Sequence, residues 1–498
     1  MRERKIPPAP SKARENSILP IRCLFSHISI DDEIRYEYLQ PGFPSVRVKL
    51  FLALAVCLSS TSLFAEETGI KINFHGQGWV DVGRIMHSPD SVPVDAGTGQ
   101  NLNGNWLRSP GAQFTMVADF SENLEGAFGF GAYKTSHAMG KENGSTRPMY
   151  YTISLFQTFL TKASLTYSQG EKPNPWLSLT AGTFSHNYNG QVKNLGHYLL
   201  RGPVYPGVLM GEFQDRNIDS TKSNVMGARL HHGLGSFSQD LILMNEKDLP
   251  PTFDWSLAYI AKYKVLDAFE LGAGVNFYRL MPYSSKLETP GHLVTDNGRS
   301  IEVLAPGDTL FYTHQGIKLM GMFNLDLKRV FGAGSMGPND LILYGEAAVL
   351  GTKNYGTIYD KIGERIPIMA GFNFPAFGFL NYLSLEVEYY RSPYRNDLAN
   401  IGNLNNVADW TDLIPSRPTP SPVPVQGIYP DSTRDNWKWS VNMEKIVAGH
   451  VHFIAQVAND HFRPRPMATT SISSKGGTAE AFTSPKDWYL MFRMGYFF

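Results

Sequence analysis

The chain has 498 residues and a formal net charge of zero; only 18% of its residues are charged, while 12% are aromatic. A charged fraction below that of ordinary soluble proteins, combined with many aromatic residues, speaks against a disordered chain. The lack of net basic charge speaks against nucleic acid as a partner, because binding to a phosphate backbone needs a basic face.

The first 65 residues are set aside from the fold. Residues 46–65 have the pattern of a secretory signal peptide: Arg47 and Lys49 precede an apolar stretch that ends in small residues, with cleavage expected after Ala65. The apolar stretch is too short to cross a bilayer as a helix. Because a signal peptide begins near the start of a chain, residues 1–45 are interpreted as a mis-assigned start or a disordered extension. A short buried helix is the alternative for the apolar stretch.

Both cysteines of the sequence, Cys23 and Cys57, lie before this cleavage site. The processed protein is therefore expected to contain no disulfide and no cysteine-bound zinc. Cleavage of a lipoprotein type before Cys57 is the weaker alternative, because Val56 is bulky where a small residue is needed.

From residue 66 onward, apolar and polar residues alternate with a period of two. Ile70, Ile72 and Phe74 alternate with Lys71 and His75, and the pattern returns many times. A helix cannot produce it, because every second residue of a helix spreads around the whole circumference. Such segments fit strands of about 9–11 residues that cross a bilayer in a closed barrel, although a soluble sandwich alternates too.

The pattern predicts sixteen strands, and the connections between them sort by parity. The strands are expected near residues 70–84, 112–120, 124–134, 150–167, 176–186, 223–233, 236–246, 254–265, 269–280, 315–329, 340–350, 365–374, 382–393, 434–444, 449–460 and 485–498. Alternate connections are brief, whereas 187–222, 281–314, 394–433 and 461–484 are long. Long outer loops and short periplasmic turns are typical of outer-membrane barrels. Residues 66–498 are therefore expected to form an all-β, antiparallel up-and-down transmembrane β-barrel.

The last strand carries the most specific signal. Hydrophobic residues occupy every second position up to the last residue: Trp488, Leu490, Phe492, Met494, Tyr496 and Phe498. This ending resembles the assembly signal of Gram-negative outer-membrane β-barrels, and the whole resembles a porin-like barrel of about sixteen strands. The resemblance implies outer-membrane lipid, lipopolysaccharide and the barrel-assembly machinery as partners, and a homotrimer as an expected assembly. An edge strand of a soluble domain is the alternative.

A barrel of sixteen strands is wide enough to hold an aqueous channel. Alternation predicts that these charged residues face the lumen: Lys71, Asp81, Arg229, Asp240, Lys318, Asp326, Glu386, Glu388, Lys438 and Arg493. Their signs are mixed, so no strong preference for anions or cations follows. Lining the lumen and pairing across strands is the simpler role for each of them.

The connection 187–222 is the third outer loop by this count, and in porins that loop often folds inward and narrows the pore. The resemblance therefore suggests constriction residues, with an ordinary surface loop as an equal alternative. The candidates are Tyr198, Arg201, Tyr205, Glu212 and Asp215.

Enzymatic readings have little support. His450 and His452 share one strand face, but no cysteine or metalloprotease motif accompanies them. The favoured function is a passive channel for small hydrophilic solutes, without catalytic residues, metal or cofactor. The alternative is a structural or adhesive barrel whose outer loops bind a surface or polymer.

Overall fold

The computed structural model describes most of the strand-forming part of the chain. The described residues are 70–87, 91–95, 98–101, 104, 106–137, 155–172, 174–200, 223–245, 254–281, 293–296, 299–305, 308–313, 316–332, 336–352, 362–391, 436–459 and 486–498. The predicted signal peptide and the residues before it lie outside this part of the chain.

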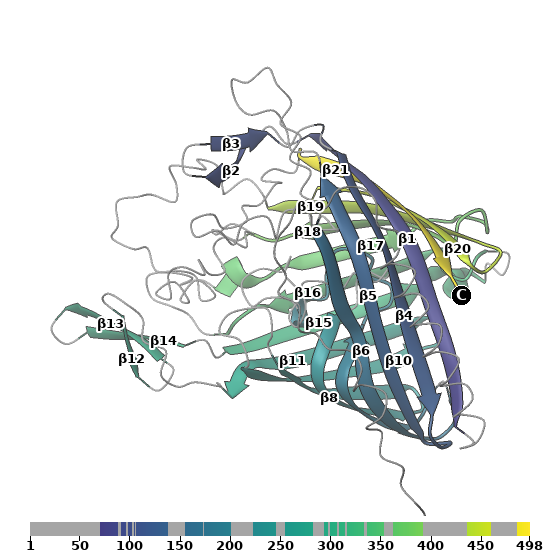
Figure 1. Ribbon diagram of the computed structural model, residues 1–498. Coiled ribbons are helices and arrows are strands. Elements are labelled where there is room, and N and C mark those ends of the chain that lie inside the picture. Colours follow the sequence, from purple (N-terminus) through teal and green to yellow (C-terminus); the bar gives the residue numbers. More distant parts are fainter. Residues whose placement is uncertain are drawn as a thin grey trace, which may run out of the picture. The chain divides into compact units, whose positions relative to one another are not determined.

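Sixteen described strands form one closed antiparallel barrel (Figure 1). Each pairs with its neighbours in chain order, and the first strand pairs with the last. The barrel strands are β1 (Lys71–His87), β4 (Trp106–Asp119), β5 (Leu124–His137), β6 (Leu155–Gln169), β7 (Leu177–His186), β8 (Ser223–Leu234), β9 (Phe237–Asn245), β10 (Trp255–Leu266), β11 (Phe269–Met281), β15 (Gly316–Asp326), β16 (Ile342–Val349), β17 (Ile368–Asn373), β18 (Tyr382–Tyr389), β19 (Trp437–Val447), β20 (Val451–Ala458) and β21 (Trp488–Phe497). The predicted fold class and strand number are confirmed.

Three local predictions need correction. The strand predicted at 112–120 begins at Trp106. The strand predicted at 315–329 ends at Asp326, and the chain continues as the short helix α2 (Leu327–Phe331). The Asp326 side chain accepts the backbone N–H of Arg329, and Gly332 closes the helix in the left-handed conformation, so both helix ends are capped. The strand predicted at 365–374 begins only at Ile368, because Pro367 cannot donate to the ladder.

Two connections contain small sheets that the alternation did not reveal, namely the one between β1 and β4 and the predicted long connection 281–314. One pairs β2 (Ser91–Asp95) with β3 (Thr98–Asn101). The other orders β12 (Leu293–Asp296), β13 (Arg299–Ala305) and β14 (Asp308–Thr313). Short turns join strands at the opposite end, for example the two residues between β8 and β9. We call this end the short-turn side.

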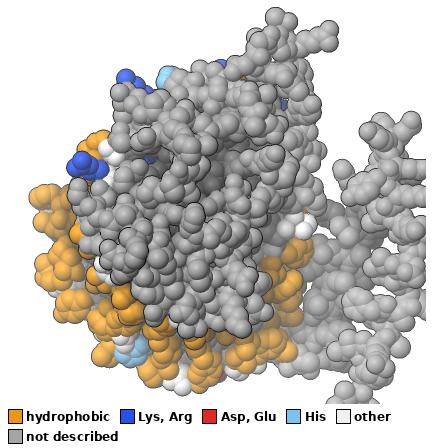
Figure 2. Space-filling view, turned by 90° about the vertical axis from the view of Figure 1, so that its left-hand side faces the viewer, with side chains coloured by type: hydrophobic (Ala, Val, Ile, Leu, Met, Phe, Trp, Pro, Cys, Tyr) orange, Lys and Arg blue, Asp and Glu red, His pale blue; other side chains and the backbone are white. Residues whose placement is uncertain are grey.

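The two faces of the wall differ in polarity as predicted. On β1, Val80 is 42% exposed whereas its neighbour Asp81 is 1% exposed; on β21, Phe492 is 44% exposed and Arg493 is 5% exposed. Figure 2 shows hydrophobic side chains gathered along the outer edge of the described part. An outward apolar surface around a closed sheet, with backbone hydrogen bonds satisfied within the barrel, is what a bilayer requires. The barrel is therefore a membrane-spanning one.

Among the described residues, no helix is long and apolar enough to cross a membrane.

The closing seam joins β1 to β21. Gly76 and Phe498 exchange two backbone hydrogen bonds, and the Phe498 ring lies over Gly76. A Cβ atom at Gly76 would lie 2.1 Å from that ring, so only glycine leaves room for it. The terminal aromatic residue therefore covers the first strand, in addition to ending the alternating pattern.

Candidate functional site: a segment inside the barrel

Residues 187–200, which we call the inward segment, follow β7 and lie inside the barrel. Their contacts are with residues on the lumen face of the wall. Leu195, Leu199 and Leu200 are fully buried, and they belong to an apolar cluster that includes Ile260 and Met320 of the wall. Of the two alternatives for this connection, an inward fold or a surface loop, the described part adopts the first. It ends in a turn of 3-10 helix, η1 (Tyr198–Leu200).

Glu386 of β18 binds the middle of the inward segment through three consecutive backbone N–H groups. Its carboxylate accepts hydrogen bonds from the nitrogens of Lys193 at 2.5 Å, Asn194 at 2.8 Å and Leu195 at 2.9 Å. The hydroxyl of Tyr344 donates a fourth at 3.0 Å. A buried carboxylate is stable only when such donors surround it. The segment supplies the donors that the buried Glu386 carboxylate needs, and Glu386 supplies the acceptor for three N–H groups of the segment.

Glu346 of β16 binds the next part of the inward segment in the same way. It accepts the backbone N–H groups of His197 at 3.0 Å and Tyr198 at 2.7 Å, and the hydroxyl of Tyr188 at 2.5 Å. The Tyr198 hydroxyl in turn donates to Glu388 at 2.7 Å. Tyr198, predicted as a constriction residue, is fully buried at these contacts. Its side chain attaches the segment to the wall.

The carbonyl groups of the inward segment are bound by donors from other strands. The Lys318 ammonium donates to the Tyr198 carbonyl at 2.8 Å, and the Asn276 amide donates to the Leu199 carbonyl at 2.9 Å. Buried backbone groups need such partners, since an unpaired one costs as much as a lost hydrogen bond. Strands β11, β15, β16 and β18 therefore hold both donors and acceptors of the segment in fixed positions.

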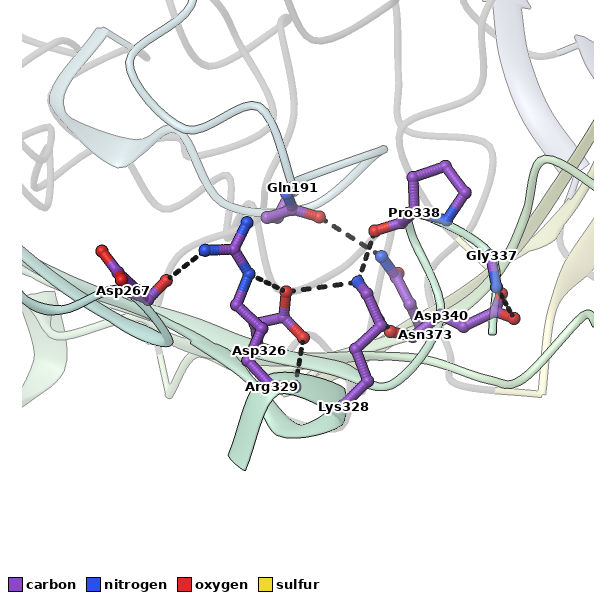
Figure 3. Close-up of polar contacts among 9 residues, drawn as sticks. All are labelled: Gln191, Asp267, Asp326, Lys328, Arg329, Gly337, Pro338, Asp340 and Asn373. Carbon is purple, nitrogen blue, oxygen red and sulfur yellow. Dashed lines mark hydrogen bonds and ion pairs between the residues drawn. The ribbon is translucent and has the colours of Figure 1, made fainter. Parts of the chain in front are cut away.

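A polar link joins the inward segment to the wall near the short-turn connections (Figure 3). The Asn373 amide donates to Gln191 at 3.3 Å. Close by in the same view, Asp326 pairs with Lys328 across 3.2 Å, and Asp340 accepts the backbone N–H of Gly337 at 2.9 Å. These contacts fix the connection between β15 and β16.

A cavity of about 1130 Å³ lies between the inward segment and the wall. Asn187, Gly190 and Lys193 form its boundary on the side of the segment. The wall contributes residues mainly from β1, β4, β6, β19 and β20: His75, Gln77, Gln113, Thr115, Thr161, Lys162, Glu444, His450, His452 and Ile454. These positions lie in the half of the barrel toward the short-turn side. The segment thus fills the bore beside β10–β18 and leaves space on the opposite side.

The predicted lumen-facing residues fall into three groups. Glu386, Glu388, Lys318 and Lys438 are on the inner face and buried, at most 3% exposed. Others form ion pairs: Arg493 binds Asp81 through two hydrogen bonds, and Arg229 lies 2.8 Å from Asp240. Lys71 is exposed at the start of β1, and Asp326 caps α2 at the short-turn side.

The remaining constriction candidates are not described by the structure. Arg201, Tyr205, Glu212 and Asp215 lie outside the described residues. Their role stays a prediction.

Sequence reasoning missed two kinds of site residue. Lys162 lines the cavity, but an irregularity in the pairing of β5 with β6 at Gly129 and Phe130 changes the alternation beside it, so simple parity does not place it. Tyr188 and Asn276 are uncharged; the alternation places Asn276 on the polar face of its strand, but it is not among the charged lumen-facing candidates. The only sequence signal for Tyr188 is the dense cluster of aromatic, asparagine and glycine residues at 182–206.

The histidines noted in the sequence take part in pairwise contacts. His452 lies 2.8 Å from Glu444, and His450 contacts the Phe497 carbonyl at 3.0 Å. Within the described part of the chain, no group of three or more histidine, cysteine, aspartate or glutamate residues could hold a metal ion.

Comparisons with known proteins give a match only among solved structures. No protein-family model and no curated protein match the sequence. A mutant porin of Rh. blastica is 8% identical, with 86% of this chain and 100% of that chain covered and a TM-score of 0.37. OmpF of Salmonella typhi in complex with daunomycin is 11% identical, with coverage of 87% and 99% and a TM-score of 0.39. At these values the description of the barrel rests on the chain's own strand pairing.

Proposed function

We propose that this protein is a porin-like channel through which small hydrophilic solutes diffuse passively. The observation that carries the proposal is the cavity of about 1130 Å³ inside a closed membrane-spanning barrel. Its walls carry amide, hydroxyl, imidazole and ammonium groups, which water and polar solutes can contact. The inward segment narrows the bore to this half, because wall carboxylates and an apolar cluster fix it in place.

We also propose an outer-membrane location. A membrane-spanning barrel with short turns at one end and long connections at the other fits that membrane. We propose that the chain is exported with cleavage after Ala65 and assembled there in contact with lipid and lipopolysaccharide. The alternating residues of β21 would serve as the signal for the assembly machinery.

Planar-bilayer recording of the purified, refolded protein tests the channel. We expect discrete, stable conductance steps that scale with the salt concentration, because water and ions enter the space beside the inward segment. A protein that inserts into the bilayer, shown by its heat-modifiable migration on gels, but remains electrically silent would contradict the proposal.

The second candidate function is a structural or adhesive barrel with a closed bore. One observation favours it: the apolar cluster between the inward segment and the wall fills part of the lumen with fully buried residues such as Leu195 and Ile242. A silent bilayer combined with binding of the protein to a polysaccharide or cell surface would support this candidate.

A further inference from the structure

One side of the cavity wall forms a polar patch without carboxylates. The patch, which we call the wall patch, consists of His75, Gln77, Gln113, Thr115, Thr161 and Lys162. Among the described cavity residues that β1, β4, β6 and β7 contribute, none is aspartate or glutamate. Amide, hydroxyl, imidazole and ammonium groups can all donate hydrogen bonds. The patch therefore offers donors and one fixed positive charge.

Strand pairing brings these residues into two adjacent rows. His75 pairs with Thr115 across β1 and β4, Thr115 pairs with Gly129 of β5, and Gly129 pairs with Lys162 of β6. In the next row Gln77 pairs with Gln113. Neighbouring strands lie about 4.8 Å apart, so one small solute can contact several of these side chains.

In the first row, the hydroxyl groups of two threonines occupy the space above Gly129. A Cβ atom there would meet the Thr161 hydroxyl oxygen at 2.4 Å and the Thr115 hydroxyl oxygen at 2.8 Å. Two hydroxyls thus converge over a residue without a side chain, next to Lys162.

Part of the patch's hydrogen-bonding capacity is unused. The Thr161 hydroxyl and the Gln77 amide nitrogen have no hydrogen-bond partner among the described residues, although both residues are less than 8% exposed. Buried polar groups normally have partners. Both atoms are shielded from the cavity as they lie here, and a rotation of either side chain would bring an unused hydrogen-bonding group to a bound solute.

Carboxylates elsewhere in the lumen are already engaged. Glu346 and Glu386 bind the inward segment, Asp81 binds Arg493, and Asp240 binds Arg229. Around the cavity itself, Glu444 is paired with His452, and Lys193 contributes a second positive charge. The lumen-facing residues carry charges of both signs, but the carboxylates are paired, so the wall patch presents a positive charge to the open half of the bore.

We infer that the wall patch is a binding site for the oxyanion group of a small solute, a carboxylate or a phosphate. This inference rests on the proposed channel function and names its solute class. Lys162 supplies the charge, Thr115 and, after a side-chain rotation, Thr161 donate hydroxyl hydrogen bonds from beside Gly129, and Gln77 and His75 border the oxyanion.

Block of single-channel current tests the site, with inorganic phosphate and succinate as separate probes and glucose as a neutral reference. In symmetric KCl, we expect phosphate or succinate to block the current at concentrations at which glucose has no effect. Lys162→Gln should weaken the block about three- to tenfold, since one charge at contact distance in a wet site has a modest effect. Gly129→Ala should weaken the block as well, because its Cβ atom would displace the Thr115 and Thr161 hydroxyls without changing the charge. Lys172→Gln removes the same charge at an exposed turn and should leave the block unchanged.

The outcomes separate this inference from the channel itself. Conducting channels that phosphate and succinate do not block, or block equally in the wild type, Lys162→Gln and Gly129→Ala, would overturn the anion site and leave the channel intact. A block by only one of the two probes would identify the source of the oxyanion. An electrically silent protein would overturn both proposals.

Discussion

Replacing Glu386 by glutamine is expected to release the middle of the inward segment and to enlarge the channel. In the wild type, the carboxylate accepts N–H groups from Lys193, Asn194 and Leu195 and the hydroxyl of Tyr344. A glutamine replaces one acceptor oxygen by an NH₂ group, which cannot accept these donors. Hydrogen bonds to a charged group contribute about 1.5–3 kcal/mol each, so we expect a loss of about 2–4 kcal/mol.

Two measurements report this change. Hydrogen exchange of the amides at 193–195 should accelerate at least about tenfold, because 1.4 kcal/mol corresponds to a factor of ten in an equilibrium. Single-channel conductance should rise and become noisier. For the exchange measurement, Glu444→Gln is the matched control: it makes the same chemical change in the same lumen, but its carboxylate contacts His452, so exchange at 193–195 should stay as in the wild type. Unchanged exchange in Glu386→Gln would contradict the assignment of Glu386 as the anchor.

Breaking the ion pair at the closing seam is expected to have the largest effect on stability. Arg493 of β21 donates two hydrogen bonds to Asp81 of β1, and its guanidinium lies 5.8 Å from the centre of the Trp79 ring. Both charged side chains are at most 5% exposed. Asp81→Asn would leave the arginine buried without its counter-charge, which typically costs about 3–5 kcal/mol.

Unfolding by urea in detergent, followed on gels by the loss of heat-modifiable migration, measures this cost. Asp119→Asn is the control. It removes an aspartate from the pair with Lys172 at an exposed turn. The hydrogen bond to Asp119 raises the pKa of Lys172, so the lysine is charged in this pair. An exposed pair contributes about 0–1 kcal/mol. The double variant Asp81→Arg with Arg493→Asp should recover part of the loss. Equal stabilities of Asp81→Asn and Asp119→Asn would contradict a structural role for the seam.

Most of the barrel could be predicted because alternate residues of a membrane-spanning strand face lipid and lumen, and their polarity differs accordingly. The alternation in β1, β18 and β21 indicates which of their residues face inward and which face outward. The regular change between long and short connections indicates the up-and-down order of the strands. Where backbone pairing departs from regularity, the alternation no longer holds. The end of β15 becomes a capped helix, and the pairing irregularity beside Gly129 obscures the place of Lys162.

The site was harder to predict because it depends on contacts between distant parts of the chain. Glu386 was placed in the lumen by its alternation, but its partners lie almost two hundred residues earlier in the sequence. Alternation therefore indicates which carboxylates face inward without indicating which of them a loop will cover. Asn276 and Tyr188 act through single polar atoms, and alternation indicates at most the face of such a residue, not the atom of a distant segment that it binds.

The central claim is that current flows through the space between the inward segment and the wall, and cysteine labelling tests it most directly. The chain beyond Ala65 contains no cysteine, so in a protein expressed from Glu66 onward an introduced cysteine is the only thiol. Thr115 lines the cavity, whereas Phe128 on the neighbouring strand faces outward and is 49% exposed. A sulfonate-bearing thiol reagent should reduce the single-channel current of Thr115→Cys and leave that of Phe128→Cys unchanged. Modified Thr115→Cys channels with undiminished current would contradict the claim.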